Sequence, residues 1–69
     1  MSIPWNDGFK IEVKIINNEV VISANNDGLL SLSRQLSALA DELPGTHIHY
    51  DEFNSLEDGS AQLVIVKAE

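Results

Sequence analysis

The segment FKIEVKIINNEVVISA, residues 9–24, decides the fold, because its pattern predicts two strands joined by a tight turn. Apolar and charged residues alternate without a break over residues 9–15, so the apolar side chains share one face. Asn17 and Asn18 tolerate the positive φ angles that a two-residue hairpin turn requires. Residues 19–24 are then predicted to form the returning strand. Its apolar face comprises Val20, Ile22 and Ala24.

After this hairpin the spacing of apolar residues changes from two to three and four, which predicts a helix. Residues 25–28, Asn-Asn-Asp-Gly, end the strand and offer an N-cap, and Pro44-Gly45 ends the helix. We expect this helix to cover the apolar face of a small sheet. The stripe expected to face the core comprises Leu29, Leu32, Leu36, Leu39, Ala40 and Leu43.

A period of two returns in residues 46–51 and again in residues 61–67, so both segments are predicted strands. Between them, residues 52–60 are predicted to form a loop with a turn at Asp58-Gly59. The predicted fold is α+β: a single-domain ββαββ arrangement with a four-stranded, mainly antiparallel sheet and one helix on one face. The strand order expected is 2-1-3-4.

The length of 69 residues allows one domain, predicted to span residues 1–69 with an N-terminal arm at residues 1–7. A chain of this size buries ~60% of the surface that its unfolded form exposes, so the core is a single layer. Trp5 in the arm either caps this core or is exposed as an interface anchor, and capping is the favoured interpretation.

Cysteine is absent, which suits a reducing cytosol. The N-terminus lacks the features of a secretory signal, and the longest apolar run, residues 63–66, is far too short for a membrane span. We therefore expect a soluble, cytoplasmic protein. Eleven acidic against four basic residues give a net charge of −7. This charge repels nucleic acid and anionic membranes and speeds encounter with a basic partner, although it also serves solubility alone.

One helix covers one face of the predicted sheet, so the other face meets water or a partner. Most of its residues are polar, as on an open face, but Val21, Val64 and Val66 are not. These valines indicate a contact surface, through which a homodimer could form, or they simply favour strands. His47 and His49 lie on the same face as Val64 and Val66 in this prediction.

The run H-x-H-x-D-E, residues 47–52, raises the question of a metal site. Side chains two apart on a strand lie about 7 Å from each other on one face, so His47 and His49 could share a metal with Asp51. A zinc site requires a fourth ligand as well. The simpler interpretation is that His47 and His49 are two surface histidines on a strand without a metal. No nucleophile elbow or phosphate loop is present. We predict no enzyme, no catalytic residue, no metal and no cofactor.

Asp51, Glu52, Glu57 and Asp58 cluster within eight residues around Phe53 and Leu56. One interpretation is a solvated turn whose two hydrophobic residues fold back onto the core. The other is an acidic rim with apolar anchors, which is the composition expected of a loop that recognises a basic protein.

Residues 25–41, NNDGLLSLSRQLSALAD, and residues 45–67, GTHIHYDEFNSLEDGSAQLVIVK, together resemble the immunity protein 32 family of bacterial polymorphic toxin systems. The similarity covers roughly residues 20 to 67, and its most specific part is the run from His47 to Ser60. The resemblance implies a binding module that neutralises a cognate toxin. It carries over no catalytic residues.

The predicted function is therefore a non-enzymatic immunity protein that binds a basic protein toxin through an acidic surface. The alternative is a small self-associating structural or regulatory domain. The residues predicted to bind the partner are His47, His49, Asp51, Glu52, Phe53, Glu57, Asp58, Val64 and Val66.

Overall fold

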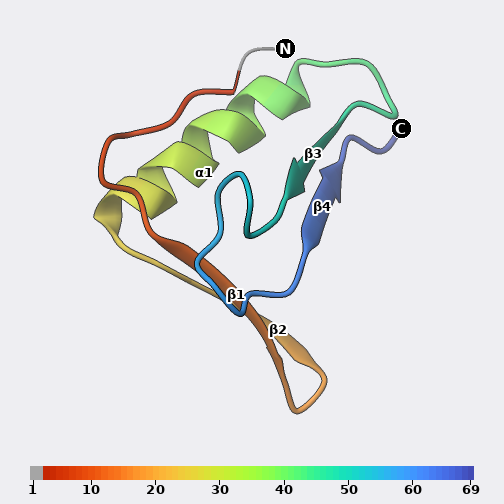
Figure 1. Cartoon of the computed structure of the whole chain (residues 1–69). Coiled ribbons are helices and arrows are strands. Elements are labelled where there is room, and N and C mark those ends of the chain that lie inside the picture. The colour runs from red at the N-terminus through yellow and green to blue at the C-terminus, as the bar shows by residue number, and fades with distance from the viewer. Residues whose placement is uncertain (1–2) are drawn as a thin grey trace.

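Four strands and one helix follow one another along residues 3–69, the part of the chain that this computed structural model describes (Figure 1). They are β1 (Ile11–Ile16), β2 (Glu19–Ala24), α1 (Asn26–Ala40), β3 (His47–Tyr50) and β4 (Leu63–Val66). The predicted α+β class and ββαββ order are confirmed. Residues 3–69 contain no helix that is long and apolar enough to cross a membrane.

The hairpin of β1 and β2 has the antiparallel pairing that the sequence predicts, with Ile11 opposite Ala24 at its base. Asn17 and Asn18 form the turn, with φ angles of 51° and 64°. Both angles lie in the left-handed region, which asparagine tolerates better than most residues, and a type I′ turn requires both to be positive. The two asparagines therefore fix the register of this hairpin.

The four strands form two antiparallel pairs, β1–β2 and β3–β4, so the predicted order 2-1-3-4 with β3 beside β1 is wrong. The loop before β4 occupies the edge of β1 that β3 was expected to take. The Glu57 N–H donates to the Ile11 carbonyl oxygen over 2.9 Å, and the Ala61 N–H donates to that of Val13 over 2.8 Å. The Val13 N–H donates to Ser60 Oγ over 3.2 Å. These bonds pair the loop with the edge of β1 at Ile11 and Val13 without a strand.

The helix α1 begins at a side-chain cap and is tied to β1 at that point. Asn25 Oδ1 accepts hydrogen bonds from the Gly28 N–H (2.8 Å) and from the Lys10 N–H (3.0 Å). The helix ends at Ala40, before the predicted stop at Pro44-Gly45, and Lys67 Nζ donates to the Ala40 carbonyl oxygen over 2.8 Å. A cation at this end favours the helix dipole.

The face of α1 that meets the core differs from the predicted leucine stripe. Leu39 is buried and Leu32 partly buried, but Leu43 beyond the helix is 79% exposed. Polar side chains take the central positions because the N-terminal arm supplies partners: Ser31 Oγ accepts from the Asn6 N–H over 2.8 Å. The buried residues of α1 are Gly28, Ser31, Gln35 and Leu39. The members of the predicted stripe that are exposed instead are Leu29, Leu36, Ala40 and Leu43.

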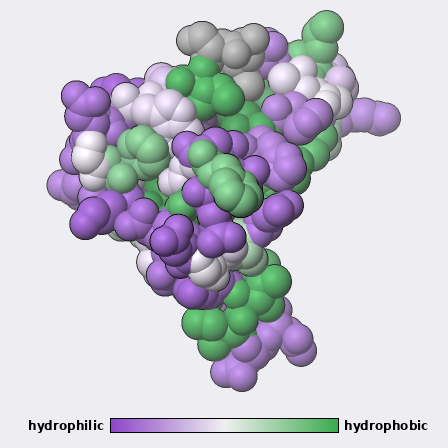
Figure 2. All heavy atoms as spheres, viewed as in Figure 1, coloured by the Kyte–Doolittle hydropathy of each residue, from purple (hydrophilic) through white to green (hydrophobic). Residues whose placement is uncertain are grey.

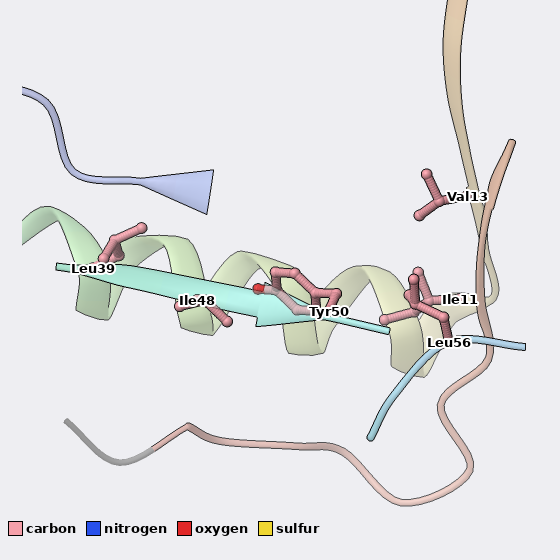
Figure 3. Packing of buried hydrophobic residues seen from close by; sticks show 6 residues of the cluster. All are labelled: Ile11, Val13, Leu39, Ile48, Tyr50 and Leu56. Carbon is pink, nitrogen blue, oxygen red and sulfur yellow. The ribbon is translucent and has the colours of Figure 1, made fainter. Parts of the chain in front are cut away.

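The core is a thin layer between α1 and β3, closed at one end by β1 (Figure 3). Trp5 packs against this layer, stacked on Phe9 with ring centroids 4.3 Å apart and edge-on to Tyr50 at 6.3 Å. The structure thus supports the interpretation that Trp5 caps the core. The fully or nearly buried hydrophobic residues are Ile11, Val13, Leu39, Ile48, Tyr50 and Leu56.

Tyr50 anchors a hydrogen-bond chain that links β3, α1 and the arm. Its hydroxyl donates to Gln35 Oε1 over 2.6 Å, and Gln35 Nε2 donates to the Pro4 carbonyl oxygen over 2.8 Å. Burial raises the pKa of the Tyr50 phenol above its ordinary value of 10.0, because the phenolate is poorly solvated there. The neutral, protonated form is the one that the fold requires.

This pKa shift predicts a loss of stability in alkali. The folded protein holds the Tyr50 proton more tightly than the unfolded chain, so the contribution is complete below the unfolded pKa and is lost as pH rises through the folded pKa. Urea unfolding between about pH 8 and about pH 11 should show a steeper loss for the native protein than for Tyr50→Phe. Parallel curves would contradict this. The two proteins differ only in the Tyr50 hydroxyl, so the comparison isolates the phenol.

Candidate protein-binding surface

The loop between β3 and β4 is a structured turn whose first residue holds it in shape. Asp51 Oδ1 accepts from the Phe53 N–H (2.9 Å) and the Asn54 N–H (3.0 Å). The Asp51 carbonyl oxygen accepts from the Leu56 N–H over 2.8 Å and from the Ser55 N–H over 3.1 Å. Because one residue satisfies four backbone donors, the conformation of this turn is set before any partner arrives.

The far end of the same loop is fixed to β1. Glu52 Oε2 accepts from the Gly59 N–H over 2.7 Å, and Lys14 Nζ donates to the Gly59 carbonyl oxygen over 3.3 Å. Gly59 has a φ of 84°, a conformation that glycine adopts without strain. We refer to residues 51–60 as the acidic loop, and this loop is held at both ends.

The two large hydrophobic residues of the acidic loop differ in their exposure to solvent. Leu56 is buried against the core, whereas Phe53 is 96% exposed. In their placement, Leu56 folds back onto the core, as the first interpretation expected, and Phe53 projects into solvent, as the second requires. An almost fully exposed aromatic ring on a fixed loop is costly in water and suits an anchor for a binding partner.

The carboxylates around Phe53 are largely open to solvent. Glu52, Glu57 and Asp58 are exposed and Asp51 is partly buried, so the loop carries four negative charges against the single Lys14 that contacts it. The remaining basic side chains with hydrogen bonds lie elsewhere, at Ala40 for Lys67 and at Asn6 for Arg34. The loop therefore presents a net negative charge beside its aromatic ring.

The outer face of β3–β4 continues from this loop. His47 lies opposite Val66 and His49 opposite Val64, and all four are exposed, as predicted. Asn54 Nδ2 donates to the His49 carbonyl oxygen over 3.0 Å, so the loop begins directly at the end of this face. Five of the nine predicted partner-binding residues thus lie at or next to the start of the loop, with Glu57 and Asp58 near its end and the pair of His47 and Val66 at the far end of the face.

Val21 does not belong to this surface. It lies on β2 opposite Lys14, in the other strand pair, so the predicted open face that joined it with Val64 and Val66 is not continuous. The possible metal set is also not assembled: within residues 3–69 no three histidine, cysteine or acidic side chains gather in a metal-binding group. The carboxylate of Asp51 is engaged with the backbone of its own loop.

Sequence inspection missed a second exposed surface, on the half of the β1–β2 hairpin nearest the turn. Ile15, Val20 and Ile22 were assigned to the core-facing side, and they do share one side of the hairpin. They are nevertheless exposed, because the loop bonds to the backbone of β1 at Ile11 and Val13 and the strands continue beyond these residues. The signal in the sequence that could have indicated this exposed surface is the apolar alternation that continues without a break up to the turn.

The fold and this surface define a small α+β protein whose exposed features suit the binding of another protein. The sequence model described as Immunity protein 32 matches residues 19–68 of the chain. The chain therefore belongs to the Immunity protein 32 family, as the resemblance indicated. This membership suggests a toxin-neutralising role and implies a toxin as partner. Neither a curated protein nor a solved structure matches the chain.

Proposed function

We propose that this protein neutralises a cognate toxin by binding it through the acidic loop and the adjoining outer face of β3–β4. Membership of the Immunity protein 32 family supports the role, and immunity proteins of this kind are generally non-enzymatic. The observation that carries the proposed site is Phe53, 96% exposed on a loop whose backbone is held by Asp51 and Glu52. A rigid aromatic anchor loses little entropy on binding.

The toxin, in this proposal, is a basic protein that belongs to a polymorphic toxin system and is met in the cytoplasm. The chain carries a net charge of −7, and four of its acids lie in the acidic loop. Complementary charge raises the rate of encounter and orients the partners, while the apolar anchor slows their separation. Val64 and Val66 extend the apolar contact along β4.

The direct test is co-expression with the products of the genes that flank this one. We expect one of them to be toxic alone, to be tolerated together with this protein, and to co-purify with it. Protection by the native protein but not by a Phe53→Asp variant would assign the effect to this surface. A failure to protect against, or to bind, any neighbouring product would refute the proposal.

Neutralising two loop charges should slow association with the toxin. Glu57→Gln with Asp58→Asn is the variant to use, because Asp51 and Glu52 hold the loop backbone and their replacement would confound charge with shape. We expect the association rate to fall severalfold at low salt with little change in dissociation. The difference should vanish at high salt, since the Debye length shrinks from about 10 Å at 0.1 M to about 3 Å at 1 M.

The matched control removes the same two charges at the end of α1, as Asp41→Asn with Glu42→Gln. These residues lie outside the acidic loop, so their neutralisation should slow association less. If both double variants associate equally fast, overall net charge and not the loop steers the toxin. If the loop variant associates as fast as the native protein at low salt, the electrostatic part of the proposal is wrong.

A further inference from the structure

The half of the β1–β2 hairpin nearest the turn projects away from the rest of the molecule (Figure 1). We call residues 15–22 the hairpin tip. One side of this tip is apolar and open: Ile15 is 66% exposed, Val20 61% and Ile22 42%. Figure 2 shows the resulting hydrophobic area over the hairpin. Burying such an area against another surface is favourable, and small soluble proteins seldom leave one open without a partner.

The backbone of β2 is also open along its outer edge. In a hairpin with a two-residue turn, the residues next to the turn share hydrogen bonds, and bonded and unbonded pairs then alternate. On β1 the groups that point away are those of Ile11, Val13 and Ile15, and Ile11 and Val13 bond to the loop before β4. Their partners on β2, which are Ala24, Ile22 and Val20, therefore also point their N–H and C=O groups outward. Within residues 3–69 no group outside the hairpin bonds to Val20 or Ile22.

The sequence of this edge is self-complementary. When β2 is paired antiparallel with β2 of a second copy about Ile22, Ile22 faces its own counterpart, Val20 faces Ala24 and Glu19 faces Asn25. No like charges lie opposite each other in that register. Residues 13–26 carry one lysine and one glutamate, whereas the rest of the chain carries the other ten acids and three basic residues. The edge thus carries no net charge, which limits the repulsion between two such acidic chains there.

We infer that β2 pairs with β2 of a second copy of this chain, so that two hairpins form a four-stranded β1-β2-β2-β1 sheet. Each apolar tip then lies beside the base of the other hairpin, where α1 begins and Leu29 is exposed. Antiparallel pairing of this kind gives a closed two-fold dimer. The acidic loop lies along the opposite edge of the hairpin, on β1, so both toxin-binding surfaces stay free. The inference does not depend on the proposed function.

A cysteine pair tests the register directly, because the native chain has no cysteine. Bonded antiparallel pairs have Cα atoms about 5.5 Å apart, within the usual disulfide range of about 4.4–6.8 Å. We expect Ile22→Cys to form a disulfide-linked dimer under mild oxidation, at least tenfold faster than the matched control Val64→Cys on the outer face of β4. Equal rates for the two variants would overturn the register.

Sedimentation of the full chain tests the association itself, from micromolar to millimolar concentration. We expect a dimer that tightens with added salt, because screening weakens repulsion between two chains of charge −7. Val20→Pro removes an outward N–H that the hairpin does not use and should weaken the dimer at least tenfold. Val64→Lys with Val66→Lys should not weaken it.

Three results would overturn the inference. The first is a native protein that stays monomeric at every concentration and salt. The second is a dimer that persists in Val20→Pro but is lost in the Val64→Lys, Val66→Lys variant, which would place the interface on β3–β4. The third is a native protein that forms no dimer, combined with a Val20→Pro variant that no longer binds the toxin. That result would assign the β2 edge to toxin binding. Circular dichroism of each variant shows whether it is folded.

Discussion

Replacing Phe53 with alanine is expected to raise the dissociation rate of the toxin complex about 30-fold, equivalent to ~2 kcal/mol, and to leave the fold intact. The ring makes almost no contact within its own chain, since it is 96% exposed. Its removal should therefore change the free energy of unfolding by no more than about 0.5 kcal/mol. In the complex the same ring would be buried whole, among carboxylates that exclude competing partners.

The measurement is the dissociation rate of the native protein and of Phe53→Ala from the same immobilised toxin, at low and high salt. The loss should be insensitive to salt, in contrast to that caused by neutralising Glu57 and Asp58. Leu43→Ala is the control, because Leu43 is another exposed hydrophobic residue outside the acidic loop. Equal dissociation of all three proteins would exclude Phe53 as the anchor. An unfolded Phe53→Ala variant would place the ring in the core.

The β1–β2 hairpin could be predicted because its information is local. Alternation sets the faces of the strands, and Asn17-Asn18 sets the turn and with it the register. The neighbour of β1 on its other edge could not be predicted in the same way. That edge was open to β3 or to the loop, and the loop prevails through backbone bonds from Glu57 and Ala61 that leave no mark on the pattern of hydrophobic residues.

The helix illustrates a different limit. The periodicity of the sequence located α1 correctly but assigned the wrong face of the helix to the core. A face chosen by hydrophobicity alone ranks leucine above serine and glutamine. Ser31 and Gln35 are buried since the arm and Tyr50 satisfy their polar groups, and such partners come from residues remote in sequence. A buried polar residue can be predicted only when its partner is known.

The candidate binding surface was predicted as a set of residues but not as a shape. The acidic cluster and the exposed histidines and valines of β3–β4 follow from composition and strand phase. Composition and strand phase do not predict which of Phe53 and Leu56 faces outward. The turn that Asp51 closes determines this. The exposed hairpin tip was missed since strand alternation identifies a face without showing how far the core extends along it.

Replacing Gly28 with alanine is expected to destabilise the protein by about 2 kcal/mol, although alanine is the better helix former by ~1 kcal/mol. A Cβ atom at this position would lie 2.6 Å from the carbonyl oxygen of Lys10 and 3.0 Å from side-chain atoms of Ala24 and Ile11. The Lys10 backbone cannot easily move away. Its N–H donates to Asn25 Oδ1 (3.0 Å), and its carbonyl oxygen accepts from the Asn25 N–H (3.1 Å).

The measurement is the free energy of unfolding in urea of Gly28→Ala, with Ser37→Ala as the control. Ser37 is an exposed position of α1, so its replacement changes only helix propensity. Ser37→Ala should match or slightly exceed the native stability. A Gly28→Ala variant that does the same would show that α1 is free to shift away from β1.

A domain of 69 residues has roughly 3–10 kcal/mol of stability, so a loss of about 2 kcal/mol is substantial. Because the added Cβ would press on Ile11, whose carbonyl oxygen accepts the hydrogen bond from the Glu57 N–H, the displacement should reach the acidic loop. Gly28→Ala should therefore weaken both folding and toxin binding, whereas Phe53→Ala weakens binding alone.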